Sequence, residues 1–166
     1  MKITITGTPG TGKTTVANIL SKKLNLPLFN ISELVKKEKL YIEFDSERNA
    51  FVVDPEKLRE FFHNKKHFIA EGLVAHYIPS DILIILRVNP KKIPERLAER
   101  NYTEEKVREN EEAEKFAVIA TEAIEKSKAK RILHIDTTKR KPEDVVNLIL
   151  EGIGGKEVFE EVDWLE

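Results

Sequence analysis

The chain has 166 residues, of which 40% are hydrophobic and 34% are charged, and 28 Lys and Arg nearly balance 29 Asp and Glu. This length predicts a single domain, and the hydrophobic content is too high for a disordered chain. The small net charge argues against general nucleic-acid binding and against membrane binding driven by charge. The absence of Cys excludes disulfides, thiol catalysis and zinc–thiolate sites. The longest apolar run, Ile82 to Leu86, is too short to span a bilayer, so we expect a soluble, cytoplasmic protein.

The first third of the chain contains several helix and strand signals. Residues 2–6 alternate β-branched side chains, which predicts a strand, and the apolar positions that follow recur at helical spacing. A brief strand over 28–29 precedes a charged segment over 30–39 that we expect to be helical. Residues 40–53 show no clean period, so we expect a mobile loop there. Residues 54–55, Asp followed by Pro, mark the start of another helix.

The middle of the chain contains two continuous apolar runs, 67–70 and 82–88, which are typical of strands buried on both faces of a parallel sheet. Residues 89–90, Asn followed by Pro, mark another helix start, and we expect one long charged helix over 103–130. This helix carries an acidic run that we interpret as a solvated face, in preference to a set of paired catalytic carboxylates. The acidic run comprises Glu109, Glu111, Glu112 and Glu114.

The chain ends with a predicted strand over 132–135 and a predicted helix over 142–150 that stops at Gly152. Strands and helices therefore alternate about five times, which predicts an α/β domain with a parallel sheet covered on both sides. The acidic segment 156–166 has interleaved apolar residues and leaves two interpretations open, a docked amphipathic helix and a partner-binding tail.

One motif indicates the chemistry. The segment Gly7-Thr8-Pro9-Gly10-Thr11-Gly12-Lys13-Thr14 fits the P-loop pattern G-x-x-x-x-G-K-[ST], after a strand and at the start of a helix. Glycines allow backbone N–H groups to turn toward phosphate oxygens, and the helix adds its positive N-terminal end. We expect Lys13 to reach the β- and γ-phosphates of ATP and Thr14 to offer its hydroxyl to Mg²⁺. The predicted ATP contacts in this motif and just after it are Gly10, Gly12, Lys13, Thr14 and Thr15.

Three further segments, together with the P-loop, carry a resemblance that covers about residues 2–150. They are Asn30-Ile31-Ser32-Glu33-Leu34, Asn49-Ala50-Phe51-Val52-Val53-Asp54, and Arg100-Asn101-Tyr102 with Asn110-Glu111 beyond it. In these segments the chain resembles the adenylate kinase isoenzyme six family, also described as coilin-interacting nuclear ATPase proteins, in its archaeal form.

The resemblance implies a P-loop NTPase fold of the nucleoside-monophosphate kinase type. Its five-stranded parallel sheet would have the order 2-3-1-4-5 and would be flanked by helices within a single domain, 1–166. A nucleoside monophosphate (NMP)-binding insert would lie near 30–53 and a very short lid near 99–109.

The same resemblance implies the reaction ATP + AMP ⇌ 2 ADP with broad acceptor tolerance, together with ATP hydrolysis. It also implies a role in late maturation of the small ribosomal subunit, through transient contact with one of its platform proteins. We expect a monomer. Two competing interpretations are an ATP-driven assembly factor whose kinase turnover is incidental, and a small-metabolite kinase of the shikimate type.

Outside the P-loop, Glu71 ends a buried apolar strand, where P-loop enzymes hold the carboxylate that binds Mg²⁺. The alternative is a carboxylate that caps local backbone donors. Arg100 matches the lid position of the family, so with Lys13 and Glu71 it completes the predicted catalytic group. Arg96, one helical turn earlier, is either a second phosphate contact or a solvated charge. Lys139 is either an adenine-side contact or solvated.

On the acceptor side, Lys36 stands where adenylate kinases generally place an Arg that holds the acceptor phosphate, and a Lys lacks the bidentate fork. Asp45, Arg48 and Asn49 are candidates for contacts to the acceptor base. Eukaryotic members of the family carry Asp-x-His where this chain has Glu71-Gly72-Leu73, and His76 comes further on. His76 therefore either orients a water, contacts a phosphate, or is an ordinary loop histidine.

Overall fold

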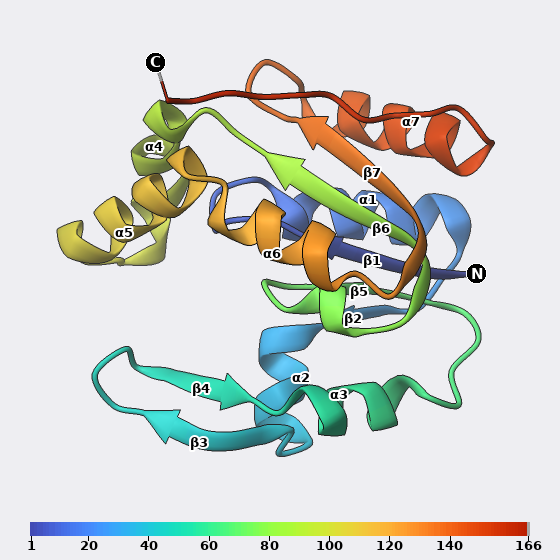
Figure 1. Cartoon of the computed structure of the whole chain (residues 1–166), viewed down its shortest axis with the longest axis horizontal. Helices are drawn as coiled ribbons and strands as arrows, with labels where there is room; N and C mark the ends of the chain where they lie inside the picture. The colour runs from blue at the N-terminus through green and yellow to red at the C-terminus, as the bar shows by residue number, and fades with distance from the viewer. Residues whose placement is uncertain (166) are drawn as a thin grey trace.

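The computed structural model describes residues 1–165, and its centre is a five-stranded sheet (Figure 1). In chain order, these strands are β1 (Lys2–Thr6), β2 (Leu28–Asn30), β5 (Phe68–Glu71), β6 (Ser80–Arg87) and β7 (Ala129–Asp136). All pairings are parallel, and the spatial order is β2-β5-β1-β6-β7. Counted within this sheet the order is 2-3-1-4-5, so the predicted fold is confirmed.

Helices cover both faces of the sheet. They are α1 (Lys13–Leu24), α2 (Ile31–Lys37), α3 (Pro55–Phe62), α4 (Ile93–Leu97), α5 (Glu104–Lys115), α6 (Val118–Lys126) and α7 (Pro142–Ile153). Three short 3-10 helices also occur, η1 (Ala75–Tyr77), η2 (Pro90–Lys92) and η3 (Ala98–Arg100). Helices α1 and α7 pack on one face, whereas α6 packs on the other (Figure 1). Within residues 1–165, no helix has both the length and the apolar character that crossing a bilayer requires.

Strand β6 shows why a continuous apolar run predicts a central parallel strand. Ile84 and Leu86 belong to the apolar cluster with α1 and α7, whereas Leu83 and Ile85 belong to the cluster with α6. Each of these four side chains is fully buried. Since successive side chains of a strand point to opposite faces, both faces must be apolar when both are covered.

The expectation of a mobile loop over 40–53 is wrong. Strands β3 (Tyr41–Asp45) and β4 (Ala50–Val53) form an antiparallel hairpin there. The Phe51 ring lies 4.4 Å from the Tyr41 ring and 5.0 Å from the Phe44 ring, centroid to centroid, which joins the two strands. A register shift between Tyr41 and Glu43 interrupts the alternation of side chains, and this bulge conceals the strand period in the sequence.

The single long helix expected over 103–130 is also wrong. Helix α5 ends at Lys115, Ala117 takes a left-handed backbone with φ of 54°, and α6 begins at Val118. This break places the two helices in different directions, so that α6 covers the sheet while α5 extends beyond it (Figure 1). The interpretation of the acidic run as a solvated face fails for Glu114, which is 1% exposed, although Glu109 and Glu112 are exposed.

The C-terminal tail is docked, but as an extended segment and not as a helix. It runs beside β7, where His134 N–H donates to the Val158 carbonyl at 3.0 Å and Glu160 N–H donates to the His134 carbonyl at 2.9 Å. Val158 is 4% exposed and belongs to the apolar cluster under α7. The tail therefore extends the sheet edge beyond β7. Helix α7 itself continues past Gly152 and ends at Ile153.

Candidate active site

The P-loop joins β1 to α1 at the carboxyl end of the central strand. Gly12 precedes α1 with φ of 92°, a conformation that side chains disfavour. A Cβ at Gly7 would lie 2.7 Å from the Leu86 carbonyl oxygen and 2.6 Å from Thr11 Oγ1. The turn is closed by Thr11, whose N–H and hydroxyl both donate to the Thr8 carbonyl, at 3.2 and 2.8 Å. Glycine at position 7 thus permits the close approach to Leu86, and glycine at position 12 permits the left-handed backbone before α1.

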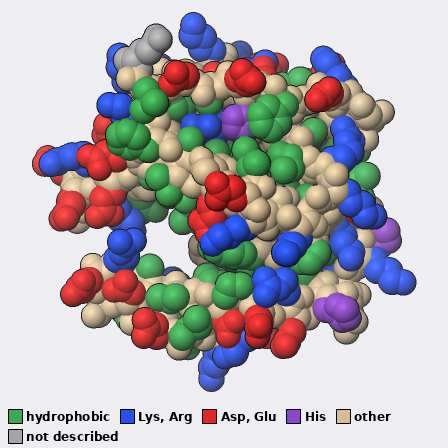
Figure 2. Space-filling view, in the orientation of Figure 1, with side chains coloured by type: hydrophobic (Ala, Val, Ile, Leu, Met, Phe, Trp, Pro, Cys, Tyr) green, Lys and Arg blue, Asp and Glu red, His purple; other side chains and the backbone are tan. Residues whose placement is uncertain are grey.

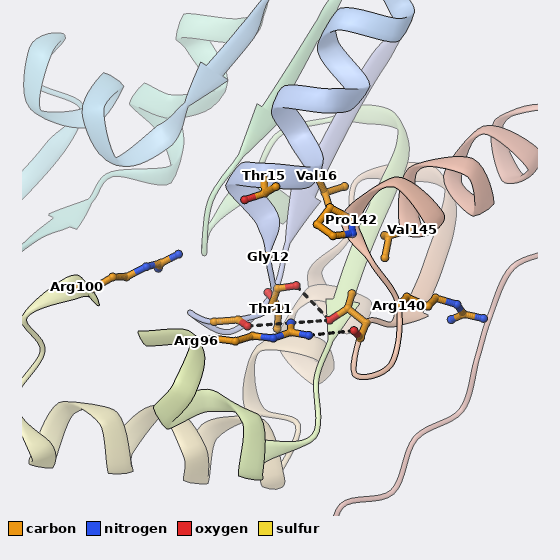
Figure 3. Close-up of a pocket in the computed structure, with 11 residues that line it drawn as sticks. Thr11, Gly12, Thr15, Val16, Arg96, Arg100, Arg140, Pro142 and Val145 are labelled. Carbon is orange, nitrogen blue, oxygen red and sulfur yellow. Dashed lines mark hydrogen bonds between the residues drawn. The ribbon is translucent and has the colours of Figure 1, made fainter. Parts of the chain in front are cut away.

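A cavity of about 300 Å³ lies against this loop (Figure 3). It is bounded by the P-loop and the start of α1, by the arginines before α5, and by the connection from β7 into α7. The lining residues are Gly10, Thr11, Gly12, Thr15, Val16, Arg96, Arg100, Thr137, Arg140, Pro142 and Val145. Its position at the carboxyl edge of a parallel sheet and its mixed polar and apolar walls suit a nucleotide.

The side-chain pKa of Lys13, the first residue of α1, is lowered by its surroundings. Removal from water lowers the pKa of its ammonium from 10.5 to about 8. The neighbouring cation of Arg100 acts in the same direction, whereas the carboxylates of Glu71 and Glu114 raise this pKa. The ammonium is therefore mostly charged at neutral pH and can pair with phosphate oxygens.

Glu71, at the end of β5, is brought together with Thr14, as expected for residues at the carboxyl ends of adjacent strands. The Thr14 hydroxyl donates to Glu71 Oε1 at 3.2 Å, and the side-chain amide of Asn30 donates to the same oxygen at 2.5 Å. Glu71 is 2% exposed. One buried carboxylate beside a hydroxyl fits Mg²⁺, which is usually bound by few protein oxygens together with substrate phosphates.

The two arginines before α5 have different surroundings. Arg96 donates to the Gly10 carbonyl at 3.2 Å and to the hydroxyl and carbonyl of Thr137 at 3.1 and 3.0 Å. It thus ties α4 to the P-loop and to the β7–α7 connection, and partial burial lowers its pKa. Arg100, the last residue of η3, also lines the cavity and extends toward it (Figure 3). Of the two guanidinium groups, Arg100 is the one positioned to meet a phosphate.

The β7–α7 connection presents Arg140 to the cavity, whereas Lys139 is exposed and is not among the lining residues. The guanidinium of Arg140 is turned toward the C-terminal tail (Figure 3), where it pairs with both carboxylate oxygens of Glu160. This pairing raises the pKa of Arg140 and lowers that of Glu160. The stem of Arg140 therefore forms cavity wall while its charge is neutralised outside.

The predicted acceptor-side residues lie on α2 and on the β3–β4 hairpin. The Lys36 ammonium lies 6.0 Å from the centre of the Phe51 ring. Asp45 closes the hairpin turn, since its carboxylate accepts the N–H groups of Glu47 and Arg48 at 3.1 and 3.2 Å, and Asn49 has φ of 51°. Figure 2 shows a deep hollow between this hairpin and the part of the surface formed by α5.

His76 is 1% exposed and belongs to η1. Its ring packs on Tyr77 with 4.4 Å between ring centres, and its Nε2 lies 3.8 Å from Glu122 of α6. Burial lowers its pKa, so the ring is neutral at pH 7. The structure places His76 against α6, and it is not among the residues that line the P-loop cavity.

Sequence reasoning missed Asn30, Arg140 and Glu114 as contributors to this site. Asn30 carried a detectable signal, because it precedes a helix and its side-chain oxygen accepts the N–H of Glu33 as an N-cap. Arg140 and Glu114 gave none, since their partners are distant in the chain.

Comparison with known proteins places this site in a family. A family model described as "AAA domain" matches residues 3–117. A protein of Methanococcus maripaludis named "Putative adenylate kinase" is 42% identical over all of this chain and 96% of its own length. A protein of the same name from Methanocaldococcus jannaschii is 43% identical over all of this chain and 94% of its own length. The chain belongs to this family of archaeal adenylate kinase homologues.

Solved structures agree on the fold of the family. A shikimate kinase from Bacteroides thetaiotaomicron superposes with a TM-score of 0.62 at 20% identity, covering 93% of this chain and 98% of its own. A deoxyadenosine kinase from M. mycoides with bound dATP superposes with a TM-score of 0.59 at 18% identity, covering 93% of this chain and all of its own. Both proteins are kinases by name, and the chain shares their P-loop fold.

Proposed function

We propose that the protein is an adenylate kinase that transfers the terminal phosphoryl group of ATP to AMP, giving two molecules of ADP. The observation that carries the proposal is the P-loop cavity, which Arg100 faces and which is lined by Gly12, the residue directly before Lys13. The names of the archaeal relatives support the same reaction. Other nucleoside monophosphates would be accepted with lower efficiency.

On the donor side, the P-loop N–H groups and Lys13 would hold the phosphates of ATP, with Thr15 at the α-phosphate. Thr14 and Glu71 would hold Mg²⁺, which when bound neutralises phosphate charge. Arg100 would contact the transferring phosphoryl group, because its planar guanidinium matches the equatorial oxygens. Lys139 would lie on the adenine side, next to the wall that Arg140 provides.

On the acceptor side, we assign residues 30–53 to the NMP-binding insert and 99–109 to the lid of a single domain. Lys36 would hold the acceptor phosphate as a point charge, and Asp45, Arg48 and Asn49 at the hairpin turn would face the base. The hollow between the hairpin and α5 provides the space for AMP (Figure 2). Closure of the lid over this hollow would align acceptor and donor and would exclude water.

The test is ADP formation from ATP and Mg²⁺, with and without AMP, in wild type and in Lys13→Met. We expect AMP to accelerate ADP formation at least about tenfold, and Lys13→Met to abolish the acceleration. Shikimate and other small hydroxyl acceptors serve as the specificity control, because shikimate kinases share the fold. A rate that AMP leaves unchanged, or wild-type phosphotransfer in Lys13→Met, contradicts the proposal.

A second candidate function is that of an assembly factor of the isoenzyme six type, which would hydrolyse ATP while it acts on a basic platform protein of the small ribosomal subunit. The observation that favours it is the tail, which Val158 anchors while Glu157, Glu161 and Asp163 stay exposed. Exposed acidic residues on an anchored strand would attract a basic partner. Hydrolysis measured with and without that protein, in full-length chain and in a chain truncated after Gly155, tests this role. Unchanged binding after truncation would exclude the tail as the contact.

A further inference from the structure

Helix α5, whose first half lies in the proposed lid segment, places one buried carboxylate against the P-loop. Glu114 lies in the last turn of α5 and is 1% exposed. Its Oε1 accepts the hydroxyl of Thr8, the second residue of the P-loop motif, at 2.9 Å. Its Oε2 accepts Arg87 Nε–H at 2.8 Å and the N–H of Val88 at 2.9 Å.

All three partners donate to this carboxylate, so both of its oxygens are occupied. Arg87, at the end of β6, supplies the compensating charge and also donates to the Glu114 carbonyl at 3.2 Å. A buried ion pair with every oxygen occupied holds its members in one geometry. The end of α5 is thereby fixed to the end of the central strand β6.

Thr8 connects Glu114 to the rest of the P-loop, residues 7–14, which would hold the phosphates. Its side chain binds Glu114 while its carbonyl accepts both bonds from Thr11 that close the loop. The backbone N–H groups that follow Thr11 are the ones that would face phosphate oxygens. Any displacement of Thr8 therefore changes the direction of those N–H groups.

We propose that Glu114 is a positioning residue for phosphoryl transfer, which holds the first turn of the P-loop, through Thr8, to the end of helix α5. This assignment rests on the proposed use of ATP at the P-loop. Glu114 would not touch the substrate. Its carboxylate would keep the P-loop in the shape that binds ATP·Mg²⁺.

The substitution Thr8→Val removes the hydroxyl and leaves the Glu114–Arg87 pair in place, so it tests the link with little risk to folding. We expect it to weaken ATP·Mg²⁺ binding, measured by titration calorimetry, about tenfold, the effect of losing a charge-assisted hydrogen bond. Thr8→Ser should restore binding to within about twofold. Glu112→Gln removes a negative charge at an exposed position of α5, the helix that carries Glu114, and should bind ATP·Mg²⁺ as wild type does.

Glu114→Gln gives a second measurement of the same link. Its side-chain amide offers one oxygen in place of the two that accept from Thr8, Arg87 and Val88. We expect ATP·Mg²⁺ binding to weaken about tenfold or more, and the double variant Thr8→Val with Glu114→Gln should bind no more weakly than Glu114→Gln alone, because both changes break one link. Arg87 is left without its counter-charge in Glu114→Gln, so circular dichroism must first establish that this variant is folded.

The outcomes are distinct. Wild-type ATP affinity in Thr8→Val, or failure of Thr8→Ser to restore a loss, overturns the proposal, and so do additive losses of affinity in the folded double variant. If Glu114→Gln does not fold, the Thr8→Val and Thr8→Ser comparison decides alone. Calorimetry needs no acceptor, so a wild-type protein that binds ATP but does not phosphorylate AMP refutes the proposed function and leaves this test intact.

Discussion

The Thr14 hydroxyl donates to the Glu71 carboxylate across 3.2 Å, which joins the start of α1 to the end of β5. These residues are 57 positions apart in the chain, yet parallel pairing of β1 with β5 brings the two strand ends together. The same Glu71 oxygen accepts a hydrogen bond from the Asn30 amide at the end of β2, so the carboxylate is held from both strands that flank β5 in the sheet. A hydroxyl and a carboxylate fixed at this distance form the donor set expected for Mg²⁺.

Glu71→Gln should therefore impair catalysis without unfolding the protein. The amide has the same shape and can keep a bond to Asn30 or to Thr14, but it removes the negative charge that Mg²⁺ requires. We expect kcat for ADP formation to fall about 100-fold or more, with a higher Mg²⁺ concentration at half-maximal rate. Glu60→Gln, at an exposed position of α3, is the control and should keep the wild-type Mg²⁺ dependence. An unchanged Mg²⁺ profile in Glu71→Gln would contradict the assignment.

Lys13→Met should lose ATP binding but gain stability. Removal from water places the pKa of Lys13 at about 8, below its ordinary value of 10.5. The folded state thus disfavours the charged form, and this cost is complete at pH values below about 8 and disappears as the pH rises toward 10.5. Thermal unfolding should show a Tm several degrees above wild type at pH 7, with the difference shrinking between pH 8 and 10.5. An equal or lower Tm at pH 7 would contradict this account.

The parts of the fold that the sequence predicted are those with local signals. The P-loop is one contiguous motif, and β6 is a run of apolar residues that only a doubly covered strand requires. Thr14 and Glu71 were predicted separately as Mg²⁺ contacts, and the parallel pairing of β1 with β5 accounts for the hydrogen bond between them.

The remaining features depend on contacts that no local pattern encodes. The β3–β4 hairpin lacks alternation because of the bulge after Tyr41, and its partly buried apolar side chains are covered by distant parts of the chain, including α3 and β5. Glu114 looks like any acidic residue of a charged helix until Thr8, 106 positions away, and Arg87 are seen beside it. The break at Ala117 follows from the same anchoring, since the last turn of α5 is fixed to β6.

The docked tail predicts a difference between two apolar positions. Val158 is 4% exposed within the main core, whereas Leu165 is 59% exposed. Val158→Ala should lower the free energy of unfolding by about 1–2 kcal/mol, because it removes two buried methyl groups and leaves a void. Leu165→Ala should change it by less than about 0.5 kcal/mol. Urea titrations followed by fluorescence measure both values, and equal effects would show that the tail is not docked at Val158 in solution.

The hairpin proposal predicts that Lys36→Arg improves the acceptor site. Lys36 is exposed at the end of α2, next to Phe51 of the hairpin, and a Lys offers a phosphate only a point charge. Arginine at this position can bind two phosphate oxygens at once and can stack on the Phe51 ring. We therefore expect the KM for AMP to fall about three- to tenfold, with the KM for ATP unchanged. Steady-state kinetics with each substrate varied in turn measures the two constants.

Two control variants complete this prediction. Lys36→Met should raise the KM for AMP about tenfold or more, since the charge is lost while the stem is retained. Lys37→Arg makes the same Lys-to-Arg change at the exposed neighbouring position and should leave both KM values within about twofold of wild type. If Lys36→Arg and Lys36→Met both leave the KM for AMP unchanged, the acceptor phosphate is not bound at Lys36. The NMP-binding role of α2 and the hairpin would then have to be assigned to other residues.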